Sequence, residues 1–415
     1  MNYTLRTALR LSLRGGGSRT GIAIAVAGVA LAVVVLEITL AVVTGFKQEI
    51  RRKLAGFDAQ ISVLAPFEAG SSEQVPYFDY TDSLQTIVRG ALPAQATVAA
   101  AWRVPGILKT DTDFEGVVFE GRQPDSDFSF ERSNIVRGAW PDYAADSCAN
   151  QIVISEALAG RLGLDLGDRL FSTFVFDGNV RMRRHTIGAL YCSDFGEYDL
   201  KVVYCSPALL RSVGGAGELA ANRLDIRGLD EDLIDPAAQS LQTALLNEAA
   251  MGRLDAYFPV SSVHQSGALY YNWLALLDTN VVVIFILMLA VAGLTLISSL
   301  FILILERIRT IGILRALGST RSEIRTIFVL LTLKVVGWGL LIGNVLGIGF
   351  LILQKNTGLV PLDPDMYYLS SVPVDINVWA IIALNVGVVA AAYLILVLPA
   401  GAAARISPAE AAKFD

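Results

Sequence analysis

Four long apolar runs interrupt an otherwise mixed pattern of hydrophobic and polar residues along the chain. They span residues 21–45, 279–305, 326–354 and 376–404. Together they contain only two ionisable side chains, Glu37 and Lys334. A helix rises ~1.5 Å per residue, so ~20 apolar residues cross the ~30 Å hydrocarbon core of a bilayer. We therefore predict four transmembrane helices.

The interval between the first two runs, residues 46–278, has a different pattern. Short alternating apolar stretches such as 151–155 and 169–175 predict strands, and 155–162 has helical character. Residues 174–185 have the form of a β-hairpin with an Asp-Gly turn. The expected fold class is an α-helical membrane protein with four transmembrane helices plus an α+β extracytoplasmic domain between helices 1 and 2.

Within that interval we expect two parts. Residues 46–120 and 210–278 should form the part next to the membrane, and 121–209 should be inserted as a distal part. The interval is long enough for a folded domain with its own core.

Composition and charge orient the helices. The 415-residue chain is 53% hydrophobic and only 17% charged, which favours a membrane protein. Residues 1–20 contain four arginines and no acidic residue, and residues 306–325 contain five arginines. Residues 355–375 contain a single positive residue, Lys355. Because positive residues favour the cytoplasmic side, both termini (1–20 and 405–415) and 306–325 should be cytoplasmic, with 46–278 and 355–375 outside. The first run is too long for a cleaved signal peptide, so in a bacterium we expect a multi-pass inner-membrane protein.

The cytoplasmic loop has a helical pattern of its own. Apolar side chains recur at Ile308, Ile311, Leu314 and Leu317, which predicts a short amphipathic helix over 306–317 with arginines along its other side.

A turn should follow this helix. Gly318 suits a left-handed helix cap, and Thr320 with Glu323 matches a capping box that starts a new helix. Two interpretations remain open: an interfacial helix whose arginines meet anionic lipid headgroups, or a surface that docks a cytoplasmic partner.

A family resemblance bears on this choice. The segment ERIRTIGILRALGSTRSEIRTIF closely resembles the loop after the second span in permeases of the FtsX/MacB superfamily. The stretch DPDMYYLSSVPVDIN, residues 363–377, is similar to the outer loop of the lipoprotein-releasing (LolC/LolE-type) branch, where a Y-Y-x-x-x-x-P-V pattern recurs. The resemblance implies a MacB-like periplasmic core domain. It also implies the permease subunit of an ABC transporter that extracts lipoproteins from the inner membrane.

In that superfamily the loop is a coupling helix that fits a cleft in the ATPase subunit. The resemblance therefore implies no cofactor in this chain, with ATP and Mg bound by a separate cytoplasmic ABC ATPase dimer. The other implied partners are a second permease copy or paralogue, lipoprotein cargo, a periplasmic lipoprotein carrier and membrane lipids, but no nucleic acid. The residues implied for ATPase coupling are Glu306, Arg307, Ile308, Ile311, Leu314, Arg315, Leu317 and Gly318.

The residue chemistry favours neither a motor nor a hydrolase. The stretch GILRALGST, residues 312–320, lacks the lysine and the spacing of a Walker A loop. The two histidines, His185 and His264, form no HExxH pair, and no G-x-S-x-G motif occurs. We therefore predict no metal site and no catalytic residues, and expect the energy to come from a separate ATPase.

The spans also offer little for a polar pore, because a water-filled channel normally presents several ionisable residues on one helical face. Whether Glu37 and Lys334 pair is open, since their depths differ by ~10 Å at 1.5 Å per residue. The helical pattern continues beyond the first span through 45–54, and another helical stretch, 267–278, precedes the second. Both helices should therefore extend outward as stalks that carry rigid-body motion.

Acyl-chain cargo would need an apolar surface, since each buried CH₂ contributes ~0.8 kcal/mol. We expect a cleft between spans one and two of facing subunits; ordinary packing or lipid contact is the alternative for each residue. The predicted lining is Val33, Leu36, Glu37, Leu40, Val283, Phe285, Ile286 and Leu289.

The hairpin is the candidate carrier contact. By the resemblance, Arg181, Arg183 and Arg184 would meet the acidic rim of a soluble carrier, although a solvated hairpin edge would look the same. Of the three cysteines, all in the outer interval, Cys192 and Cys205 are the one pair for which a disulfide is worth testing.

Two other functions remain open. One keeps the fold and changes the task, as in a MacB-like efflux or an FtsX-like signalling permease. The other is a membrane sensor outside the ABC class whose loop merely binds lipid.

Overall fold

The chain forms two compact units in a computed structural model. The helical unit comprises the chain up to Gln48, Trp273–Pro361 and the chain from Ser371, and the sheet unit comprises Glu49–Asn272 and Leu362–Ser370. The predicted tail 405–415, and all but the last two residues of the predicted segment 1–20, lie outside the described residues. The structure describes residues 19–66, 76–110, 113–145, 148–176, 178–306 and 308–403.

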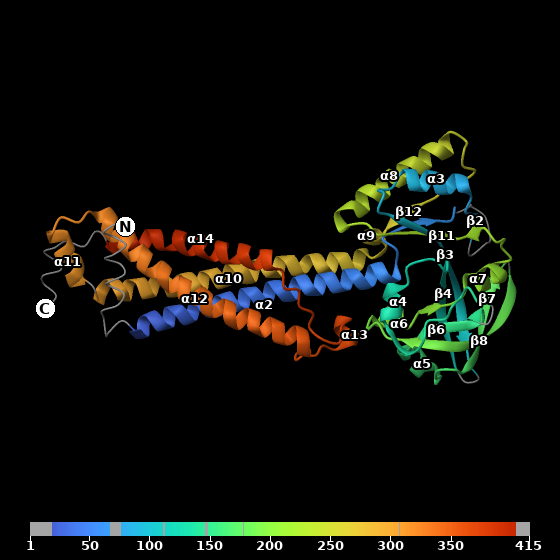
Figure 1. The fold of residues 1–415 in the computed structure, drawn as a ribbon, viewed down its shortest axis with the longest axis horizontal. Helices are drawn as coiled ribbons and strands as arrows, with labels where there is room; N and C mark the ends of the chain where they lie inside the picture. Colours follow the sequence, from blue (N-terminus) through green and yellow to red (C-terminus); the bar gives the residue numbers. More distant parts are fainter. Residues whose placement is uncertain are drawn as a thin grey trace. The chain divides into compact units, whose positions relative to one another are not determined.

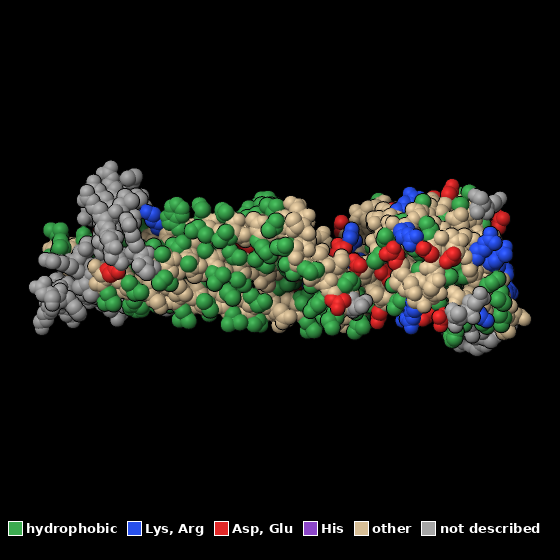
Figure 2. All heavy atoms as spheres, turned by 90° about the horizontal axis from the view of Figure 1, so that it is seen from below, with side chains coloured by type: hydrophobic (Ala, Val, Ile, Leu, Met, Phe, Trp, Pro, Cys, Tyr) green, Lys and Arg blue, Asp and Glu red, His purple; other side chains and the backbone are tan. Residues whose placement is uncertain are grey.

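Long helices build the helical unit (Figure 1). They are α2 (Arg19–Phe57), α10 (Ala268–Glu306), α12 (Arg321–Thr357) and α14 (Val378–Ala403), with the short α11 (Ile308–Ala316) between α10 and α12. Four helices in the described part of the chain are long and apolar enough to cross a membrane, which confirms the four predicted spans. Figure 2 shows apolar side chains over this unit and charged ones mainly over the sheet unit.

Two of these helices are longer than a bilayer requires. α2 and α10 have 39 residues each, which is about 58 Å at 1.5 Å per residue, roughly twice the hydrocarbon thickness. Each is one uninterrupted helix, and its outer end, Glu49–Phe57 of α2 or Ala268–Asn272 of α10, belongs to the sheet unit. The predicted extension of both helices beyond their apolar runs is therefore confirmed.

The bundle interior is apolar and draws on every long helix. α2, α10 and α11 contribute branched aliphatic side chains, and α12 and α14 close the other side. The most buried members are Val29, Val33, Leu36, Leu296, Leu300, Ile311, Ile324, Val336 and Leu396.

A ten-stranded sheet forms the second unit, in the order β12-β1-β11-β3-β4-β9-β6-β8-β5, with β7 paired to β3 and β8. Most neighbouring pairs are antiparallel, whereas β4 with β9 and β6 with β8 are parallel. β2 (Phe78–Asp79) and β10 (Ala220–Ala221) form a separate two-stranded sheet. The main strands are β1 (Ile61–Leu64), β3 (Thr97–Lys109), β4 (Phe114–Arg122), β5 (Ile135–Gly138), β6 (Gln151–Ser155), β7 (Arg169–Phe176), β8 (Asn179–Tyr191), β9 (Val202–Tyr204), β11 (Arg223–Arg227) and β12 (Val260–Ser262).

Short helices cover this sheet, and large apolar side chains such as Trp102, Phe119 and Phe174 fill its core. The α+β prediction is therefore confirmed for this unit. The two predicted parts share the sheet, because β3 and β4 from the first part pair with β7 and β9 from the second. The helices are α3 (Asp82–Gly90), α4 (Ser129–Ser133), α5 (Glu156–Leu162), α6 (Gly196–Asp199), α7 (Pro207–Gly214), α8 (Glu231–Ala250), α9 (Val263–Ser266) and α13 (Pro364–Tyr367).

The suggested Cys192–Cys205 disulfide is wrong, because these two cysteines are not joined in the structure. Cys192 follows β8 and Cys205 follows β9, and β6 lies between these strands in the sheet. Two strand spacings amount to ~9.6 Å, beyond the ~7 Å that a disulfide allows between Cα atoms.

Candidate functional sites

The cytoplasmic loop folds as predicted: a helix, a turn and a second helix. α10 ends at Glu306, and α11 ends before Gly318, whose φ of +96° suits a residue without a side chain. The capping box is present, because the Thr320 N–H donates to Glu323 Oε2 at 2.8 Å and the Glu323 N–H donates to Thr320 Oγ1 at 3.3 Å. The turn therefore has both predicted signals in place.

The apolar side chains of this loop divide between two directions. Ile311 is only 2% exposed and packs into the bundle core, so it anchors α11 to the bundle, and its part in ATPase coupling stays a prediction. Leu317 is 77% exposed and Ile313 is 56% exposed. Ile313 was missed, because the pattern spaced by three residues passed over it and only the packing reveals its direction.

The structure describes the other predicted coupling residues only in part. Glu306 is exposed and Leu314 is half-buried. Arg307 lies outside the described residues, and the side chains of Ile308 and Arg315 are likewise not described. Their contact with an ATPase stays a prediction.

The structure corrects the expected position of three cleft residues on span one. Val33, Leu36 and Glu37 are buried inside the single chain rather than exposed on its surface. Leu40, also on span one, is half-buried. On span two, Val283 and Ile286 are exposed, whereas Phe285 and Leu289 are half-buried. Their part in a cleft between subunits stays a prediction.

The cause of this burial is a stripe of glycines on α12, GLLIGNVLG at 339–347, which sequence reasoning missed. A Cβ added at Gly343 would lie 2.8 Å from Val33 Cβ, and one at Gly339 would lie 2.7 Å from Val29 Cβ. Small residues at spacing four let two membrane helices approach closely. The GxxxGxxxG spacing was a usable signal for this contact.

Glu37 is sealed at the same contact. It is 1% exposed, lies against Gly347, and neither carboxylate oxygen has a hydrogen-bond partner among the described residues. The structure thus has no hydrogen bond between Glu37 and Lys334.

The hairpin of β7 and β8 is confirmed, with Phe176 opposite Asn179 and Gly178 at a φ of +74°, while Asp177 lies outside the described residues. Of its predicted contact residues only Arg184 is exposed. Arg181 is half-buried and its Nη1 donates to the Val213 carbonyl, while its predicted role in carrier contact stays a prediction.

Arg183 is half-buried, and its Nη1 donates to the carbonyl of the preceding residue at 3.0 Å. The alternation of a strand explains the split, since odd and even positions face opposite sides of the sheet.

Arg184 shares its side of the sheet with apolar side chains. The register places Phe114, Lys109, Phe171 and Arg184 in one row across β4, β3, β7 and β8. We call this surface the β7–β8 face; its exposed apolar members are Ile107, Phe114, Phe171, Val175, Val180 and Met182.

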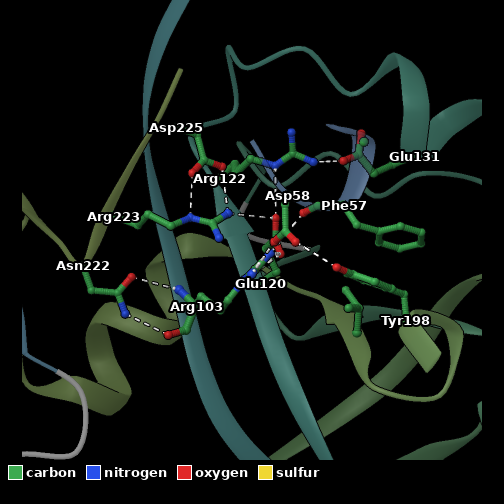
Figure 3. A network of polar contacts seen from close by, with 12 residues as sticks. Phe57, Asp58, Arg103, Glu120, Arg122, Glu131, Tyr198, Asn222, Arg223 and Asp225 are labelled. Carbon is green, nitrogen blue, oxygen red and sulfur yellow. Dashed lines mark hydrogen bonds and ion pairs between the residues drawn. The ribbon is translucent and has the colours of Figure 1, made fainter. Parts of the chain in front are cut away.

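A polar network holds the outer end of α2 in the sheet unit (Figure 3). Arg103 on β3 donates to Asp58 Oδ1 at 2.7 Å and to the Phe57 carbonyl at 3.0 Å. Arg227 donates to the carbonyls of Ala55 and Gly56. Because the last carbonyls of a helix lack partners within it and carry partial negative charge, two guanidinium groups there both cap and anchor α2.

Glu120 on β4 is the centre of this network. Its carboxylate is 1% exposed and faces Arg103, Arg122 and Arg223 (Figure 3). Burial opposes its ionisation, but the three guanidinium groups outweigh burial and hold the pKa of Glu120 at about 2. The periodicity of the sequence gave no sign that these four residues meet, because they come from three separate strands.

Two family models match the chain. One is the MacB-like periplasmic core domain over residues 22–204, and the other is the FtsX-like permease C-terminal domain over residues 282–408. The chain belongs to the FtsX/MacB superfamily of permeases. It is thus a permease of the ABC transporter class, an inner-membrane protein with a periplasmic domain.

Curated relatives resemble this permease over nearly its whole length. A lipoprotein-releasing system transmembrane protein LolC from Neisseria meningitidis is 25% identical over 98% of this chain and 97% of its own. LolC from Xylella fastidiosa is 23% identical, over 94% and 92% of the two chains. LolE from Haemophilus influenzae is 22% identical over 92% of each.

Proposed function

We propose that this permease is the membrane subunit of an ABC transporter that extracts lipoproteins from the inner membrane and transfers them to a soluble periplasmic carrier. The observation that carries the proposal is the end-to-end similarity to proteins named for lipoprotein release. No comparable feature favours the efflux, signalling or sensor alternatives.

The energy would enter at α11. Ile313 and Leu317 expose apolar surface on an otherwise basic loop, which suits a cleft in a cytoplasmic ATPase that binds ATP and Mg. The buried Ile311 ties α11 to the core of the bundle, so a push on the exposed side would be felt by the packed helices. This orientation requires both termini in the cytoplasm, as the arginine distribution predicts.

The motion would be transmitted from the membrane spans to the sheet unit through α2 and α10. Each is one continuous helix, and the outer end of α2 is held by Arg103 and Arg227 in the sheet unit. A continuous helix anchored by part-buried charge-assisted hydrogen bonds resists bending at its end. Transmission of rigid-body movement is therefore a better mechanism for this permease than conduction through a polar pore.

Cargo and carrier would meet apolar surfaces. Val283 and Ile286 on α10 remain exposed and would contact acyl chains or a second permease, whether an identical copy or a paralogue. The β7–β8 face, with Arg184 and Lys109 beside apolar side chains, suits a carrier with an acidic rim and an apolar opening.

Reconstitution tests the proposal. The permease, its copurifying ATPase and a triacylated lipoprotein are placed in proteoliposomes, and ATP-dependent release to a soluble carrier is measured. Leu317→Asp should abolish ATPase copurification and release. Ser322→Asp is the control, because it adds the same charge five residues away in the first turn of α12, where an acid is favourable. Unchanged copurification of Leu317→Asp would refute the docking site, and a complex that hydrolyses ATP without releasing lipoprotein would refute the cargo.

A further inference from the structure

Two residues with unusual backbone conformations lie close to Lys53. Asp194, with φ +57°, and Tyr368, with φ +60°, are the non-glycine residues with positive φ in the described part of the chain. Such a conformation is uncommon for a bulky side chain and persists only where surrounding contacts hold it. Lys53, near the outer end of α2, is buried and donates from Nζ to the Tyr368 carbonyl at 2.8 Å.

Acidic side chains lie near Lys53. Burial lowers the pKa of its ammonium group, and the carboxylates of Asp194, Glu49 and Asp199 partly offset that effect. Asp199 is itself buried and accepts from the Ser193 hydroxyl at 2.5 Å and from the Ser193 N–H at 3.1 Å. Lys53 is therefore a buried cation that donates to the Tyr368 carbonyl of a different segment and is acted on by nearby carboxylates.

The ring of Tyr368 is held as well. It packs edge-on against Phe195, with centroids 5.0 Å apart, and against Tyr270 on α10 at 5.7 Å. Tyr270 in turn donates to Glu197 at 3.2 Å. One residue of the outer loop thus contacts α2 through its carbonyl, and α10 and the α6 region through its ring.

That loop is closed at its base. Val372 N–H donates to the Val360 carbonyl at 3.1 Å, and Gln354 at the end of α12 donates to the Val372 carbonyl at 3.0 Å. These residues belong to the helical unit, whereas Leu362–Ser370 belongs to the sheet unit. The tip is braced internally, since Leu362 N–H donates to the Ser370 carbonyl at 3.0 Å.

We propose that Lys53 is a positioning residue that fastens the tip of the loop, Leu362–Ser370, to the sheet unit. This fastening would be a third mechanical connection beside α2 and α10, so that spans three and four move together with the sheet unit. The inference rests on the proposed function for its transport role, but the fastening itself is a property of this chain alone.

The test compares Lys53→Met with Arg52→Met. Both remove one positive charge from α2 at neighbouring positions, but Arg52 is exposed and pairs with Glu49 within its own helix. In the full-length protein, Lys53→Met should speed hydrogen exchange of the Tyr367 and Tyr368 amides about tenfold or more, because a charge-assisted bond is lost. In the complete transporter it should lower lipoprotein released per ATP hydrolysed, with ATPase copurification unchanged. Lys53→Arg should restore part of both effects.

A second pair of variants covers the case in which Lys53→Met does not accumulate. Tyr368→Ala keeps the carbonyl but removes the ring, and should also speed exchange in the tip, whereas Tyr367→Ala removes an exposed ring and should not. Unchanged exchange, or faster exchange with unchanged release per ATP, would overturn the proposal. A wild-type complex that releases no lipoprotein would refute the proposed function, and the exchange comparison would still decide the fastening.

Discussion

The contact between α2 and α12 supports a quantitative prediction. Gly343→Ala adds a Cβ that would lie 2.8 Å from Val33 Cβ, 2.9 Å from Val33 Cγ1 and 3.0 Å from the Ala30 carbonyl oxygen. One of these neighbours is backbone, so the helices themselves must separate. Overpacking of this kind typically costs about 1–3 kcal/mol.

A matched substitution isolates that cost. Gly349 lies on the same helix and has nothing within 4 Å of an added Cβ. Both substitutions gain the same helix propensity, about 1 kcal/mol, so this contribution cancels between them. Gly343→Ala should therefore be less stable than Gly349→Ala by about 1–3 kcal/mol, or roughly 5- to 150-fold in the unfolding equilibrium.

The assay is unfolding of the purified protein in mixed detergent micelles with increasing SDS, followed by far-UV circular dichroism. Equal unfolding midpoints for the two variants would show that α2 and α12 do not pack through the glycine stripe. A related double variant sharpens the result: because Gly347 faces the carboxylate of Glu37, Gly347→Ala should be tolerated better when combined with Glu37→Ala.

Three further predictions concern the sheet unit. Glu120→Gln leaves the guanidinium groups of Arg103, Arg122 and Arg223 without their shared carboxylate and should cost about 3–5 kcal/mol in thermal unfolding, whereas loss of the exposed Arg253–Glu248 pair should cost under about 1 kcal/mol. Burial alone would lower the pKa of His264, but its hydrogen bonds to Asp235 and Glu231 raise that pKa above its ordinary value. The bonds that protonated His264 makes therefore contribute fully to the free energy of unfolding below pH ~6. This contribution is lost as the pH rises through the raised pKa of His264. His264→Gln should remove this fall in stability with rising pH, and an unchanged pH profile would contradict the assignment. Arg184→Glu should weaken carrier binding while leaving the unfolding midpoint unchanged, and equal binding would exclude the β7–β8 face.

Much of this architecture follows from sequence signals that act locally. Apolar runs predict spans because a bilayer demands about 20 apolar residues in succession, and Gly318 with Thr320 and Glu323 predict the turn because a helix end needs its own cap. The strand β6 and the helix α5 were likewise predicted within a residue, and the turn of the β7–β8 hairpin was predicted, although β8 continues to Tyr191, beyond the predicted end at His185. The family resemblance rests on the same kind of short contiguous segment.

Only the tertiary structure decided which way side chains face and which distant residues meet. Ile311 and Leu317 carry the same periodic signal, yet one is buried in the bundle and the other is exposed. Val33 and Glu37 are sealed because α12 approaches through glycines, and Glu120 is ionised because arginines from three strands converge on it. The local sequence pattern determines where helices and strands form. These contacts depend instead on packing between segments far apart in the chain, and a single sequence does not indicate which distant segments will meet.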